Sequence, residues 1–165
     1  MKSVGLVLLL IAAFAYSGVE GANACETALK SKWTLYNGIR GNSVPISVVD
    51  ACLLDPAGRA ALVAGQGYSG CQGYNYYEGG DIKCDVLFAP FWKCIAAKLG
   101  YLKTNGSIEQ KKILAQFKAD ATSDPKCSVA QYNFAVKKCG TTIKNYNFLK
   151  KVQGIATATD QFTAG

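Results

Sequence analysis

The stretch DIKCDVLFAPFWKCIAAKLG, residues 81–100, decides the fold of this chain. Its apolar side chains recur at steps of three and four residues, which is the spacing of one buried face of an α-helix. Asp81 is suited to cap the first turn, and Gly100 is suited to end the last one. Pro90 has no amide hydrogen and clashes with the preceding turn, so it is expected to kink or divide the helix. We predict a central buried helix here.

Upstream of this stretch, helical spacing alternates with turn residues. Apolar residues at helical spacing predict a first helix over 24–36. Ser47 and the Asp55-Pro56 pair predict the starts of two shorter helices, because these residue types favour a first turn. Residues 65–80 are rich in Gly and Tyr, and glycine costs roughly 1 kcal/mol at an interior helix position. This segment is therefore predicted to be a long loop held by a bridge through Cys71.

Downstream, three further helices are predicted, followed by a low-charge, flexible tail over 154–165. Their predicted starts are the capping box of Ser107 and Gln110, the Asp124-Pro125 pair, and Thr141 or Thr142. Together with the upstream helices they predict an all-α fold. We expect a compact bundle of about six short helices, cross-linked by disulfides and carrying one Gly/Tyr-rich loop.

The N-terminal segment has the form of a secretory signal peptide, with a short basic start and an apolar run over 4–16. Small residues favour cleavage after Gly21, and the bond after Ala24 is the second choice. Residues 1–21 are predicted to be the signal peptide and 22–165 a single domain. No later apolar run approaches the roughly 20 residues of a membrane-spanning helix, so we expect a secreted, extracellular protein.

The chain has seven cysteines and no histidine. A zinc site would lack both a His ligand and a C-x-x-C pair, so no metal is expected, whereas export favours disulfides. We predict three disulfides and one unpaired cysteine, with the pairing left open. The odd cysteine is either a buried free thiol or an intermolecular link that makes a disulfide-linked dimer. The seven are Cys25, Cys52, Cys71, Cys84, Cys94, Cys127 and Cys139.

The sequence offers no constellation of catalytic residues. Without histidine, neither a Ser-His-Asp nor a Cys-His nucleophile can form. The close carboxylate pairs each contain a residue suited to cap a helix, so they do not predict a glycosidase. Residues 65–70 fit G-x-G-x-x-G, but no strand precedes them, so no nucleotide cofactor is expected. We predict a protein that is not an enzyme and holds no cofactor.

A resemblance to a known family begins with the run KCIAAKLGYL, residues 93–102, followed by Asn105-Gly106-Ser107-Ile108 and a Lys-rich helix. This pattern resembles the middle of insect odorant-binding proteins of the pheromone/general odorant-binding family. There a cysteine-bearing helix ends in a Lys-Leu-Gly-like turn before a short loop and another amphipathic helix. The family's C-x-x-x-C pair is replaced here by Pro90 and Cys94, so the chain resembles a divergent, atypical member.

The resemblance implies a helical bundle, closed by disulfides, around an apolar cavity that carries a small hydrophobic molecule. It also implies a pairing of Cys25 with Cys94. Aromatic and aliphatic residues on the predicted helices suit either plain core packing or the lining of such a cavity. The candidate lining residues are Trp33, Phe88, Phe91, Trp92, Ile95, Leu114, Phe117 and Phe134.

Charge suggests a second function. The formal net charge is +7, and lysines gather in the C-terminal half, at 111–112, 137–138, 144 and 150–151. Such helices are either ordinary solvated faces or the working surface of a cationic defence or salivary protein that acts on anionic membranes or polyanions. Nucleic acid is not expected as a partner, because no recognised module is present.

One motif predicts a covalent modification. Asn105-Gly106-Ser107 is an N-glycosylation sequon, and such motifs lie on surface loops of secreted proteins. The sequence therefore predicts a glycan on Asn105 when the chain passes through a glycosylating secretory pathway.

Overall fold

The computed structural model describes residues 24–35, 43–78 and 80–163, and the predicted signal peptide lies outside them. In these ranges every regular element is helical, which confirms the all-α prediction. No described helix is both long and apolar enough to span a bilayer. After an N-terminal helix over residues 24–32, the elements are α2 (Ile46–Leu54), α3 (Pro56–Gly67), the turn η1 (Ser69–Cys71), α4 (Ile82–Lys98), α5 (Gln110–Ser123), α6 (Val129–Cys139) and α7 (Phe148–Thr159).

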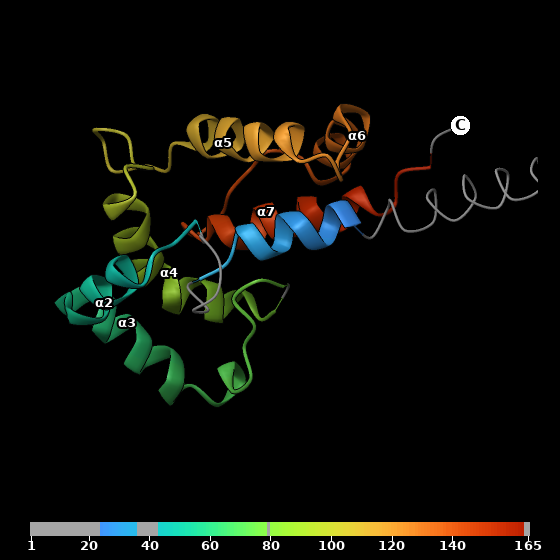
Figure 1. Ribbon diagram of the computed structural model, residues 1–165. Helices are drawn as coiled ribbons and strands as arrows, with labels where there is room; N and C mark the ends of the chain where they lie inside the picture. Colours follow the sequence, from blue (N-terminus) through green and yellow to red (C-terminus); the bar gives the residue numbers. More distant parts are fainter. Residues whose placement is uncertain (1–23, 36–42, 79, 164–165) are drawn as a thin grey trace, which may run out of the picture.

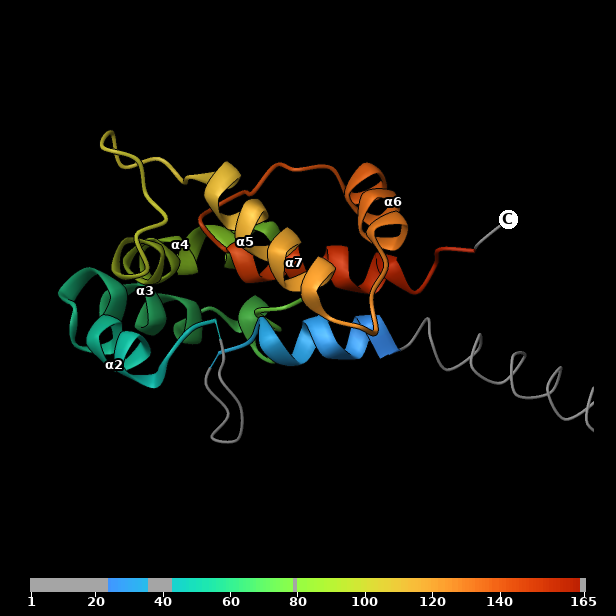
Figure 2. The same ribbon diagram turned by 45° about the horizontal axis from the view of Figure 1, so that its top comes forward.

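The helices form two groups (Figure 1). One group is α2, α3 and α4, which pack on one another, and the other contains α5, α6 and α7. The N-terminal helix lies beside α7 in both views (Figure 2). The Gln153 side chain on α7 fixes this contact by donating to the carbonyl oxygens of Lys30 and Trp33, at 3.1 and 2.7 Å.

The central helix forms as predicted, over Ile82–Lys98. The Asp81 carboxylate caps it by accepting from the Lys83 amide at 2.8 Å. The helix is continuous through Pro90, so of the two expected effects, a kink or a division, the division does not occur. Buried Phe88 and Phe91 stand on either side of the exposed Pro90, and their packing holds the helix together while the lost hydrogen bond lies toward solvent.

The predicted starts of α5 and α6 are wrong. Ser107 does not cap α5; its hydroxyl donates to Asn105, and α5 begins after Glu109 without a side-chain cap. Asp124-Pro125 makes only a turn, and α6 begins four residues later, where Ser128 and Gln131 form a reciprocal capping box. The first helix is also shorter than predicted, ending at residue 32. By contrast, Asp55 caps α3 as predicted, accepting from the Gly58 amide at 2.9 Å.

The C-terminal segment differs most from its prediction. The last helix starts at Phe148, capped by Asn147, rather than at Thr141 or Thr142. The predicted flexible tail over 154–165 is wrong as well, because α7 runs to Thr159 and its residues 155, 156 and 158 are buried. Burial of this apolar face outweighs the helix cost of Gly154.

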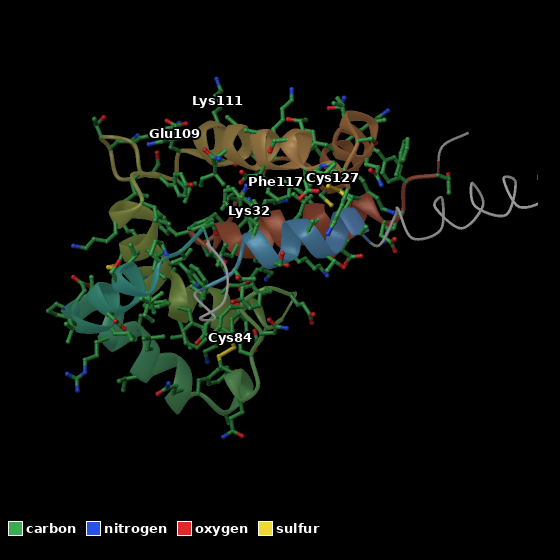
Figure 3. All side chains as sticks on the ribbon, viewed as in Figure 1. Lys32, Cys84, Glu109, Lys111, Phe117 and Cys127 are labelled. Atoms are coloured by element: carbon green, nitrogen blue, oxygen red, sulfur yellow. A yellow bond between two sulfur atoms is a disulfide. The ribbon has the colours of Figure 1, made fainter. Side chains whose placement is uncertain are left out.

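The structure confirms three disulfides and one free cysteine, Cys139. The implied pairing of Cys25 with Cys94 is wrong. Cys25 bonds to Cys127, which lies in the α5–α6 connection (Figure 3), and Cys94 on α4 bonds to Cys52 on α2. The Cα atoms lie 4.7 Å apart in the Cys25–Cys127 pair and 5.7 Å apart in the Cys52–Cys94 pair. The packing of the helices brings these cysteines together and so sets the pairing. The third bridge, Cys71–Cys84, ties the predicted Gly/Tyr-rich loop to α4.

Candidate functional site

Most of the predicted lining residues form a packed core. Trp33, Trp92 and Phe117 are almost fully buried. The rings of Trp33 and Phe117 meet edge to face, with centroids 5.5 Å apart, and the Phe148 ring meets each of the two tryptophans edge to face. Phe88, Phe91 and Ile95 belong to the same buried cluster.

The remaining two candidates, Leu114 and Phe134, are partly exposed. Phe134 packs on Phe162, with ring centroids 5.7 Å apart. Of all eight candidates only Leu114 lines one of the three grooves described below. For the other seven, the structure shows side-chain packing, and none of them lines these three grooves.

The largest of the three grooves, which we call the main groove, has a volume of about 830 Å³. It runs along α7 and is bounded by the N-terminal helix, the loop before α4 and the α6–α7 connection. The lining residues are Lys30, Tyr77, Glu78, Asp85, Cys139, Thr142, Lys144, Asn147, Lys150, Lys151, Gln153, Gly154 and Thr157.

The charge of the main groove is positive, with four lysines against two carboxylates. Lys150 pairs with Asp85 at 2.6 Å, and Lys30 pairs with Glu26 at 2.6 Å. Among the described residues, the other two lining lysines, Lys144 and Lys151, have no carboxylate within ion-pair distance. Two cations therefore remain available to a ligand.

Buried polar side chains hold the walls of the main groove in place. Asn147 is 4% exposed; its amide nitrogen donates to the Tyr76 carbonyl at 2.9 Å, and its amide oxygen accepts from the Lys150 backbone at 3.1 Å. Tyr74 donates its hydroxyl to Asp85, the same carboxylate that holds Lys150. These contacts join α7 to the Gly/Tyr-rich loop and to α4, so the groove is a preformed feature.

The free Cys139 lies in the main groove and is partly buried. Its thiol donates to the Gly154 carbonyl at 3.5 Å, and its own carbonyl accepts from the Lys151 ammonium at 3.0 Å. The predicted dimer through this cysteine stays a prediction. Among the described residues, no group of three or more metal-ligating side chains gathers anywhere.

Two smaller grooves are also basic. One, of about 520 Å³, lies between α5 and α6 and has Lys103, Lys111 and Lys118 beside the apolar Leu114. The other, of about 550 Å³, lies on α4 and has two lysines; each of these grooves has a single carboxylate. Figure 3 shows Lys111 pointing away from the body of the molecule.

The distribution of charge along the chain explains why all three grooves are basic. Residues 93–151 contain twelve lysines and three carboxylates, a formal charge of +9, and one of these carboxylates, Asp120, is buried. Residues 24–92 contain five basic and six acidic side chains, a formal charge of −1. The lysine clusters in the sequence therefore indicated which half of the chain supplies most of the positive charge.

One buried and three half-buried tyrosines are expected to limit the stability of the protein at alkaline pH. Burial raises the pKa values of Tyr76, Tyr101 and Tyr132, and burial together with Asp85 raises that of Tyr74. A folded-state pKa above the unfolded value of about 10 favours the neutral, folded form, so this stability is complete below about pH 10 and is lost as the pH rises further. We expect these four tyrosines to ionise only with unfolding.

An alkaline titration checks this expectation by following tyrosinate absorbance and helical circular dichroism together. A late rise in absorbance that coincides with loss of helix is expected, and Tyr74→Phe should shrink that late rise by one tyrosine. Ionisation of all tyrosines near pH 10 with the helices intact would contradict it.

Comparison with known proteins assigns no family and no function to this chain. No protein-family model matches the chain, and no curated protein or solved structure matches it. The likeness to insect odorant-binding proteins therefore stays a prediction from residues 93–108.

Proposed function

We propose that this protein is a secreted carrier of a small amphiphilic anion, a molecule with an apolar body and one acidic head group. The main groove carries the proposal, because its volume of about 830 Å³ lies within the size range of small-molecule sites and its lysines outnumber its carboxylates. The three disulfides support export. The likeness to odorant-binding proteins supports a carrier, although the ligand lies in an open groove rather than in an apolar core.

The two lysines of the main groove that have no carboxylate partner in the described part of the chain are the proposed binding site of the acidic head group. Lys144 and Lys151 attract it, since Lys150 is already held by Asp85. The Tyr77 ring and the open surface of Gly154 receive the apolar body, because a Cβ at Gly154 meets no neighbour within 4 Å.

Fluorescence titration of the oxidised protein with anilinonaphthalene sulfonate, an anionic apolar probe, tests the proposal. We expect saturable binding of one probe per chain. Lys144→Glu/Lys151→Glu should weaken probe binding at least about tenfold. Each lysine attracts the sulfonate of the probe by about 1 kcal/mol, and each glutamate repels it instead. Lys111→Glu/Lys118→Glu changes the net charge equally but lies in the α5–α6 groove, so it should leave probe binding unchanged.

A second pair of variants tests the position of the apolar body. Gly154→Phe fills the main groove and should abolish probe binding. Gly154→Ala adds only a methyl group and should keep it, while raising stability by about 0.8–1 kcal/mol through helix propensity. Absence of saturable binding, or binding that survives both the charge reversal and Gly154→Phe, would overturn the proposal.

The charge of residues 93–151 favours one other function, the binding of anionic membranes or polyanions by the basic C-terminal half. Sedimentation with phosphatidylglycerol vesicles distinguishes it from carriage. Strong, salt-sensitive sedimentation that is lost with Lys111→Glu/Lys118→Glu, in a protein that does not bind the probe, would support this second function and exclude the first.

A further inference from the structure

The turn between α4 and α5 displays the sequon that the proposed function does not use. The Gly106 amide donates to the Lys103 carbonyl at 2.9 Å, and the Lys103 amide donates to the Ser107 carbonyl at 2.8 Å. These bonds close a tight turn, which Gly106 permits through its positive φ of 79°. The segment between α4 and α5 projects from the body of the molecule (Figures 1 and 2), and Asn105 within it is exposed.

The side chain of Asn105 is oriented within this turn. Its Oδ1 accepts from the Ser107 amide at 3.0 Å and from the Ser107 hydroxyl at 2.6 Å. Because Oδ1 turns toward Ser107, the Nδ2 on the same carbon turns away from it. Among the described residues Nδ2 has no hydrogen-bond partner, and Asn105 is exposed. Two donors on Oδ1 also draw electron density from the amide, which favours loss of a proton from Nδ2.

The inner side of the turn is fixed to the rest of the molecule. The Tyr146 hydroxyl donates to the Gly106 carbonyl at 3.2 Å, and the Lys93 ammonium lies 5.5 Å from the centre of the Tyr146 ring. Asn105 lines none of the three grooves. A large group on Nδ2 can therefore extend into solvent without displacing a packed side chain.

We propose that Asn105 is an N-glycosylation site and that its glycan leaves the main groove open. In the transfer, Nδ2 attacks the anomeric carbon of a polyprenyl-diphosphate-linked oligosaccharide. A nitrogen–carbon bond forms, the carbon–oxygen bond to the diphosphate breaks, the proton passes to a base of the transferase, and polyprenyl diphosphate leaves. Asn105 is the asparagine that the chain places in an N-x-S/T sequence. This inference does not depend on the proposed ligand.

Expression of the full chain in cultured mammalian cells tests the site. Intact-mass spectrometry should show one N-glycan on the protein in the medium. Release by peptide-N-glycosidase in ¹⁸O-water should leave labelled aspartate at position 105. Asn105→Gln and Ser107→Ala should each abolish the glycan, whereas Ser107→Thr retains the hydroxyl and should keep it. Asn133→Gln, an exposed asparagine outside any sequon, should have no effect.

Other outcomes overturn the inference. Protein in the medium that carries no glycan in either the wild type or Ser107→Thr excludes the site, and so does a chain that is retained without modification. A glycan that survives Asn105→Gln would assign the modification elsewhere. Removal of the glycan should leave probe binding to the main groove unchanged, and a change there would contradict the second half of the proposal. Failure of the wild type to bind the probe bears only on the carrier function.

Discussion

Removal of the Cys25–Cys127 disulfide, in the double variant Cys25→Ala/Cys127→Ala, is expected to lower the free energy of unfolding by about 4–5 kcal/mol. The two cysteines are 102 residues apart, so their bond restricts a very long loop of the unfolded chain. The bond also holds the N-terminal helix against the α5–α6 connection; that helix supplies the groove residue Lys30, and the buried Trp33 follows directly after its end. Loss of the bond should therefore weaken the core and one wall of the main groove together.

Urea denaturation of a matched series measures this effect. Cys71→Ala/Cys84→Ala removes a bond that spans 13 residues, so it should cost less, about 3 kcal/mol. Cys139→Ala removes no bond and should change stability by less than about 1 kcal/mol, which controls for the substitution itself. If Cys139→Ala lowered the free energy of unfolding as much as the double variants do, loop closure would not explain the order of the three losses.

Local signals in the sequence predicted the helices whose ends are set by their own residues. Asp55 and Asp81 cap α3 and α4 as predicted, because each carboxylate meets an amide two or three residues away. Gly140 likewise ends α6 with a φ of 68°. The same reasoning failed at Gly154, where propensity predicts an end but burial of α7 against α6 and the N-terminal helix extends the helix.

Contacts between distant residues could not be predicted in this way. Periodicity shows that Trp33 and Phe117 face inward, but it does not show whether a ring or a ligand meets them. The partner of Cys94 likewise depends on how α2 packs on α4. For the candidate groove, lysine clustering marked Lys144, Lys150 and Lys151, while Tyr77 and Asp85 come from other parts of the chain and carried no signal that linked them to it.

Asp120→Ala is expected to lower the free energy of unfolding by about 2–3 kcal/mol. Asp120 on α5 is 8% exposed, and its carboxylate accepts from the Trp33 indole nitrogen at 2.8 Å and from Gln116 at 3.3 Å. Without it, the buried indole N–H loses its acceptor and remains cut off from water, which costs roughly 1–3 kcal/mol. Lys32 also pairs with Asp120, but its side chain is 49% exposed and adds little.

Asp120→Asn provides the matched control, because its amide oxygen can still accept from the indole; we expect a loss of about 1 kcal/mol. A double-mutant cycle with Trp33→Phe, measured by urea denaturation, isolates the hydrogen bond, and Asp120→Ala should cost about 1–2 kcal/mol less once the indole N–H is gone. Equal costs in both backgrounds would contradict the role of this bond.

The second buried tryptophan separates the hydrogen bond from packing. Trp92 is as buried as Trp33, at 1% exposure, but its indole nitrogen has no hydrogen-bond partner among the described residues. Trp92→Phe removes a similar volume and no hydrogen bond, so it should destabilise the protein less than Trp33→Phe does. That difference would assign to Asp120 the task of holding the N-terminal helix, and with it the Lys30 wall of the main groove, against α5.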